Sequence, residues 1–222
     1  MQIVNSEGEN LFVIRYDLIG QKGVGKRSLL CNLIKDTKVD DASSYEETKQ
    51  EITNNAELTG VICHNVRIDD RNVRLEISMK ERSSDQNILG AMFVFDVTAY
   101  ASFSALSCLI HDAKNANPNL SIILCANKTD LPETSWDVCR EDFTKFARDN
   151  EYTLFETSCL SGRNVKDLFL QLGKWIILKH PMEIPPELKY KLIKSYCADM
   201  LPEGVDLLIC VHMLEFFHIH GK

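Results

Sequence analysis

The residues best suited to chemistry form a glycine-rich segment that follows the first apolar stretch of the chain. Gly20 to Lys26 fits the pattern G-x-x-x-x-G-K and is followed by Arg27 and Ser28. Glycines in this pattern let backbone N–H groups turn toward phosphate oxygens, and the lysine reaches the terminal phosphates. A helix after the loop would add the positive end of its dipole. The predicted phosphate-binding residues are Gly20, Lys22, Gly23, Val24, Gly25, Lys26, Arg27 and Ser28.

Two later segments carry a second set of polar residues. Asn127-Lys128-Thr129-Asp130 resembles the guanine-reading motif N-K-x-D of the small GTPases, and Glu156-Thr157-Ser158-Cys159 is similar to their E-T-S-A loop. A carboxylate at Asp130 can accept hydrogen bonds from N1–H and the exocyclic amine of guanine, a pair of donors that adenine lacks. We expect the Lys128 stem to cover the base and Asn127 to tie the loops together. The predicted guanine-binding residues are Asn127, Lys128, Asp130, Ser158 and Cys159.

The resemblance to Ras and Rab proteins covers roughly Leu11 to His180. It includes Phe95-Asp96-Val97-Thr98 followed by Ser102-Phe103, which is similar to the D-x-T-x-x-x-S-F of Rab proteins. It implies binding of GTP and GDP, Mg²⁺ as a possible cofactor, and protein effectors or regulators as partners.

Two departures from the family pattern concern the metal. The family places Ser or Thr directly after the loop lysine as a Mg²⁺ ligand, whereas this chain has Arg27. Ser28 lies about 100° further around the predicted helix and cannot simply substitute. The family motif D-x-x-G is absent from residues 78–87, because no glycine occurs between Gly60 and Gly90. Gln86 is a substitute for the catalytic glutamine only by loose proximity, so Mg²⁺ binding is predicted to be weak.

The first switch is long, and the threonine that closes over the metal has two candidates. Thr48 ends a Y-x-x-T pattern similar to that of Ras, and Thr59 precedes Gly60-Val61 as in Rab proteins. The spacing from Lys26 favours Thr48, the spacing from the following strand favours Thr59, and a third possibility is that neither is a ligand. Lys22 stands where Ras has a glycine that leaves room for the catalytic water.

Apolar segments alternate with helical patterns along most of the chain. This alternation predicts an α/β, doubly wound and mostly parallel six-stranded sheet flanked by helices, the fold of P-loop NTPases, with ligands at the carboxyl ends of the strands. The predicted strands are 11–19, 61–68, 73–77, 91–97, 120–126 and 152–156. The predicted helices are 26–34, 102–116, 138–150 and 165–178.

Three parts of the chain follow from this pattern. Residues 1–10 are predicted to be an N-terminal tail, 11–180 the small-GTPase-like domain, and 181–222 a short helical extension. The extension is too short to form a core of its own, so it either docks on the domain or binds a partner.

The overall composition excludes several classes of protein. A net charge of −7 over 222 residues argues against nucleic-acid binding. Residues 205–219 are apolar but shorter than the ~20 residues of a membrane span. The chain does not end in a prenylation motif. Eight cysteines without C-x-x-C spacing indicate reduced thiols in a cytoplasmic protein.

These observations predict a divergent small GTPase that binds GTP or GDP with impaired or absent hydrolysis and acts in signalling or trafficking. One alternative is an active GTPase that uses non-standard or partner-supplied catalytic groups. Another is a pseudo-GTPase scaffold that binds no nucleotide.

Overall fold

The computed structural model describes residues 2–4, 10–35, 60–68, 71–82 and 88–179. The strands are β1 (Gln2–Val4), β2 (Asn10–Ile19), β3 (Val61–Ile68), β4 (Arg71–Lys80), β5 (Gly90–Asp96), β6 (Ser121–Asn127) and β7 (Thr153–Glu156). The helices are α1 (Lys26–Lys35), α3 (Tyr100–Ser104), α4 (Leu106–Ala116), α5 (Arg140–Asp149) and α6 (Val165–Lys179), with a 3₁₀ turn η1 (Glu133–Ser135). The predicted C-terminal extension lies outside the described residues.

The strands form one sheet in the order β3-β4-β2-β5-β6-β7, and β1 pairs with β2. β2, β4, β5, β6 and β7 are mutually parallel, whereas β3 and β1 each run antiparallel to their neighbour. The predicted mostly parallel sheet is confirmed. The predicted six strands are all present, and β1 adds a seventh from the segment that we predicted to be a tail.

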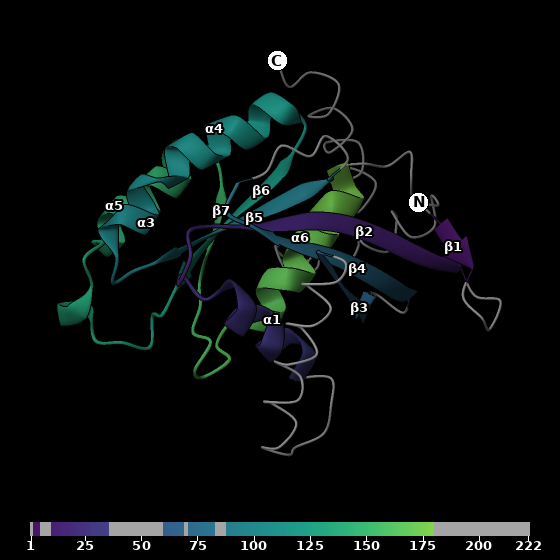
Figure 1. Cartoon of the computed structure of the whole chain (residues 1–222), viewed down its shortest axis with the longest axis horizontal. Coiled ribbons are helices and arrows are strands. Elements are labelled where there is room, and N and C mark those ends of the chain that lie inside the picture. The colour runs from purple at the N-terminus through teal and green to yellow at the C-terminus, as the bar shows by residue number, and fades with distance from the viewer. Residues whose placement is uncertain (1, 5–9, 36–59, 69–70, 83–87, 180–222) are drawn as a thin grey trace, which may run out of the picture.

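Helices cover the sheet on both faces (Figure 1). One core lies between the sheet and the pair α1 and α6, and we call it the α1/α6 core. The other lies under α4 and α5, and we call it the α4/α5 core. Strand β5 contributes to both, because Met92 and Val94 point into the first and Phe93 and Phe95 into the second. This explains why β5 and β6 are continuous apolar segments, as strands buried on both faces are.

Helix α6 rests directly on the start of β5. A Cβ added to Gly90 would lie 2.7 Å from Cδ1 of Ile176, closer than carbon atoms normally approach. Glycine at this position therefore lets the helix pack against the strand without an intervening side chain.

Two helices differ from the sequence prediction. The expected helix over 102–116 begins earlier, at Tyr100, and is divided at Ala105 into α3 and α4. The expected helix from Val138 begins at Arg140 instead, because the N–H of Val138 bonds to the carbonyl of Val97 in a loop. Within the described ranges, every helix is too short or too polar to span a membrane.

Tyr16 is the largest buried residue of the α1/α6 core that carries a polar atom. It is 1% exposed and packs near the ring of Phe169, with 6.3 Å between ring centroids. Its hydroxyl has no hydrogen-bond partner within the described structure, and burial raises the pKa of Tyr16 well above its usual value. The hydroxyl is therefore desolvated without compensation.

We expect Tyr16→Phe to leave the free energy of unfolding unchanged or to raise it by up to about 1 kcal/mol, since an unsatisfied buried hydroxyl is removed. Tyr16→Ala should lower it by about 3–5 kcal/mol through the cavity it creates. Urea unfolding measures both, and the exposed Tyr100→Phe serves as the matched control. A loss of more than about 1 kcal/mol in Tyr16→Phe would show that the hydroxyl has a partner.

Candidate functional site

The phosphate loop lies between the carboxyl end of β2 and the start of α1. Gly23 and Gly25 have φ angles of +89° and +102°, which favour glycine. A Cβ on Gly25 would lie 2.3 Å from Nδ2 of Asn127, and one on Gly20 would lie 2.4 Å from the carbonyl oxygen of Val94. The glycines thus provide both the turn and the close packing of the loop against neighbouring strands.

Lys26 is the first residue of α1 and reaches back across the loop. Its ammonium donates to the carbonyl oxygens of Gly20 (2.5 Å) and Gln21 (2.8 Å). Partial burial lowers the pKa of Lys26, and the nearby charge of Glu81 opposes that shift. The lysine is therefore positioned within the loop where a bound phosphate would exchange for the carbonyl contacts.

The other predicted phosphate residues surround this lysine with different exposures. Lys22 and Arg27 are exposed, Ser28 is half-buried, and Val24 is buried at 2% exposure. The carbonyl of Gly25 accepts the N–H of Leu29 at 2.9 Å, so helical hydrogen bonding begins inside the loop. The free N–H groups of this first helical turn point toward the loop, as phosphate binding requires.

Asn127 joins the phosphate loop to the two later loops. Its side-chain Nδ2 donates to the carbonyl of Val24 at 2.8 Å. Its Oδ1 accepts from the hydroxyl of Thr157 at 3.1 Å and from the thiol of Cys159 at 3.4 Å. The residue is 1% exposed, so these bonds are shielded from water. This is the link between the loops that the sequence predicts.

Lys128 adopts a left-handed conformation, with φ of +68°, and its ammonium forms an ion pair with Asp96. Asp96 also accepts from the backbone N–H (2.9 Å) and the hydroxyl (2.7 Å) of Thr98. Burial acts to raise the pKa of Asp96, but the contacts with Lys128 and Thr98 outweigh it and hold the pKa below its usual value. Asp96 is therefore ionised at neutral pH and anchors the lysine of the motif. The sequence comparison noted Asp96 but gave it no role.

Asp130 is exposed, while the residue before it is fixed. The backbone N–H and the hydroxyl of Thr129 both donate to the carbonyl of Thr157, at 3.1 and 2.8 Å. The turn closes with a bond of 3.2 Å from the N–H of Leu131 to the carbonyl of Lys128. The Asp130 carboxylate makes no hydrogen bond or ion pair with any described residue and remains available to a ligand.

The loop after β7 completes this side of the site. Ser158 is fully buried, and its hydroxyl accepts the N–H of Ser161 at 3.1 Å. Burial raises the pKa of Cys159 to about 11, so the thiol is neutral and donates to Asn127. Asn32 of α1 donates to the carbonyl of Cys159 at 2.7 Å and ties this loop to the phosphate helix. No sequence pattern had indicated Asn32.

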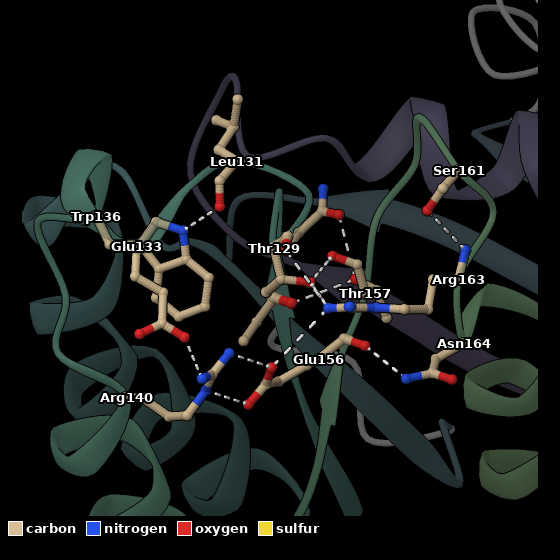
Figure 2. A network of polar contacts seen from close by, with 12 residues as sticks. Thr129, Leu131, Glu133, Trp136, Arg140, Glu156, Thr157, Ser161, Arg163 and Asn164 are labelled. Carbon is tan, nitrogen blue, oxygen red and sulfur yellow. Dashed lines mark hydrogen bonds and ion pairs between the residues drawn. The ribbon is translucent and has the colours of Figure 1, made fainter.

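A network of charges lies on the outer side of the same loop (Figure 2). Arg140 forms two hydrogen bonds to the carboxylate of Glu156, at 2.9 and 3.0 Å. It also pairs with Glu133 and lies 4.9 Å from the ring centroid of Trp136. Arg163 reaches from the other side to Thr129 and, at 4.0 Å, to Glu156. These residues escaped sequence analysis because they come together only in the fold.

Strand β4 is longer than predicted and runs past Ile77 to Lys80. Its register against β2 pairs Ile19 with Lys80, and the N–H of Gly20 donates to the carbonyl of Lys80 at 3.2 Å. The segment after the strand therefore starts directly beside the phosphate loop. The Lys80 ammonium lies 3.0 Å from the buried carboxylate of Asp17, and the exposed Glu81 acts on Lys26.

Three predicted residues, Thr48, Thr59 and Gln86, lie outside the described residues. Among the residues that are described, no group of three or more His, Cys, Asp or Glu side chains is arranged to hold a metal ion.

Comparisons with known proteins agree with this arrangement. The sequence model of the Ras family matches residues 15–178. The Ras-related protein Rab-4B of Homo sapiens is 31% identical over 179 residues, which cover 79% of this chain and 82% of that protein. The Ras-related protein Rab-4A of Bos taurus is 32% identical over 180 residues, covering 79% and 80% respectively. A match that spans most of the chain, and that includes all three loops described above, shows that this protein belongs to the Ras family.

Proposed function

We propose that this small GTP-binding protein retains GDP and GTP with little contribution from Mg²⁺ and hydrolyses GTP poorly or not at all. The observation that carries the proposal is an asymmetry of the site. The loops that would hold phosphate and base are joined by Asn127, whereas the positions that would hold the metal carry other residue types.

The phosphate and base contacts can be assigned to residues of this chain. The backbone N–H groups of 23–28 and the ammonium of Lys26 would bind the phosphates. The carboxylate of Asp130, exposed beside the fixed Thr129, would accept from the two donors of guanine. The Lys128 stem, anchored by its ion pair with Asp96, supports the loop that contacts the base.

The described residues near the phosphate loop do not fit a magnesium ion. Oxygen ligands are what Mg²⁺ prefers, but the residue after Lys26 is the cation Arg27. The end of β4 and the residues after it read Met79-Lys80-Glu81-Arg82, with two cations beside one carboxylate. Phosphoryl transfer to water depends on a metal, a positioned water and charge stabilisation. Loss of the family's metal ligands supports impaired hydrolysis.

One observation favours the second candidate, an active GTPase with non-standard groups. Glu81 is a carboxylate close enough to Lys26 to influence its charge, and it follows the residue that bonds to Gly20. Supplied with a further ligand by a partner, it would be an acidic group at the metal side of the site. Protein effectors or regulators, and a signalling or trafficking role, are also part of our proposal. We place the protein in the cytoplasm, since Cys31 and Cys125 are free, buried thiols of the core.

Guanine selectivity is expected to depend on Asp130. Asp130→Asn should weaken GDP binding by about 2–3 kcal/mol, because a charge-assisted pair of hydrogen bonds is lost. Fluorescence titration with labelled GDP and ADP measures the change, and Asp149→Asn on the exposed end of α5 is the matched control. Equal affinity of the unmodified protein for ADP and GDP would contradict the assignment.

Nucleotide retention is expected to depend only slightly on metal. EDTA should accelerate GDP release from the unmodified protein only slightly, because Arg27 takes the place of a ligand. Arg27→Ser should increase the effect of EDTA, and Lys35→Ser, at the exposed far end of α1, should not. The measurement is the release rate of labelled GDP with and without EDTA.

A large effect of EDTA on the unmodified protein would contradict weak metal binding. Glu81→Gln would then identify the ligand. If Glu81 holds the metal, the substitution abolishes the EDTA effect. If Glu81 only competes with phosphate for Lys26, removing its charge tightens GDP binding instead.

A further inference from the structure

Arg163 lies in the turn between β7 and α6, on the outer side of the base loops (Figure 2). Its guanidinium donates to the hydroxyl of Thr129 at 2.6 Å and to the carbonyl of Thr129 at 3.4 Å. Thr129 is the residue directly before Asp130. The guanidinium therefore holds the backbone from which the guanine-reading carboxylate projects.

The backbone of Arg163 is itself fixed. Its carbonyl accepts the N–H of Ser158 at 3.3 Å, so one residue contacts both base loops. Gly162 before it and Asn164 after it have φ angles of +75° and +58°, and the side-chain amide of Asn164 donates to the carbonyl of Glu156 at 2.8 Å. A turn with two left-handed residues and its own side-chain bond offers few alternative conformations.

The Arg163 side chain is also held electrostatically. It is 49% exposed and lies 4.0 Å from Oε2 of Glu156, whose carboxylate is oriented by its two bonds to Arg140. The long side chain is thus guided toward Thr129 by a carboxylate that cannot easily turn away.

Thr129 is saturated by these contacts, whereas Asp130 depends on them. Thr129 is 7% exposed, and its hydroxyl donates to Thr157 and accepts from Arg163. A hydrogen bond from a guanidinium is stronger than one between neutral groups. The Asp130 carboxylate forms no hydrogen bond or ion pair of its own in the described structure, so the position of Thr129 determines where it points.

We propose that Arg163 is a positioning residue for guanine recognition, which clamps Thr129 against the 156–164 loop and so places Asp130 opposite the exocyclic amine of the base. The proposal rests on the proposed function. A misplaced carboxylate weakens mainly the contact to the amine, because that contact requires two bonds of correct geometry at once. Phosphate contacts lie on another loop and are left intact.

The test compares GDP with IDP, which lacks the exocyclic amine. The dissociation constants of both are measured for the unmodified protein and for Arg163→Ala, Arg163→Lys and Thr129→Val. Arg163→Ala and Thr129→Val should each lower the ratio of GDP to IDP affinity by roughly three- to tenfold. The two substitutions combined should do no more than either alone, since they break the same bond. Arg163→Lys should restore part of the ratio.

Arg148→Ala, an exposed arginine on α5, is the matched control and should leave the ratio unchanged. Thermal unfolding of each variant shows whether it folds. A merely structural role for Arg163 would reduce the affinity for GDP and IDP by the same factor, and that result overturns the inference. So does an unmodified protein that binds GDP and IDP equally. Failure of the unmodified protein to bind GDP at all is distinct and overturns the proposed function itself.

Discussion

The side-chain amide of Asn127 uses its donor and its acceptor to join three loops that are far apart in the sequence. The donor bonds to Val24 of the phosphate loop, and the acceptor takes bonds from Thr157 and Cys159. Because the amide is buried, each of these bonds replaces water that cannot return, and losing one would leave a desolvated polar group. The close contact between Asn127 and Gly25 belongs to the same arrangement, since any side chain on Gly25 would displace the amide.

This link separates the site into a part that the fold maintains and a part that the sequence has changed. Lys26, Asn127 and Lys128 are held by carbonyl, hydroxyl and carboxylate partners in the described structure. On the opposite side of the phosphate loop, Arg27, Lys80 and Arg82 place positive charge where related proteins hold a cation. A switch of the Ras type depends on γ-phosphate and metal ordering two segments, and a ligand shifts an equilibrium only by its different affinity for the two states. A site with fewer such contacts should discriminate less between its GTP and GDP forms.

Periodicity predicted most of the fold because burial on two faces leaves a strong pattern. β5 and β6 are continuous apolar segments for this reason, and the glycine-rich loop was recognisable because φ angles such as that of Gly25 require glycine. The division of the helix at Ala105 and the addition of β1 were not predictable, because both depend on contacts with distant strands. Asp96 and Arg163 were missed as site residues for the same reason: their partners, Lys128 and Thr129, lie more than thirty residues away.

The most direct test of the account is the identity and amount of nucleotide and metal released when the purified protein is denatured. Chromatography of the supernatant quantifies the nucleotide, and elemental analysis of the native protein after gel filtration quantifies magnesium. The account predicts GDP or GTP in near-stoichiometric amount and magnesium well below one ion per chain. Absence of guanine nucleotide, with the protein folded and able to bind none when it is added, would contradict nucleotide retention. One magnesium ion per bound nucleotide would contradict the claim that this site has lost its dependence on the metal.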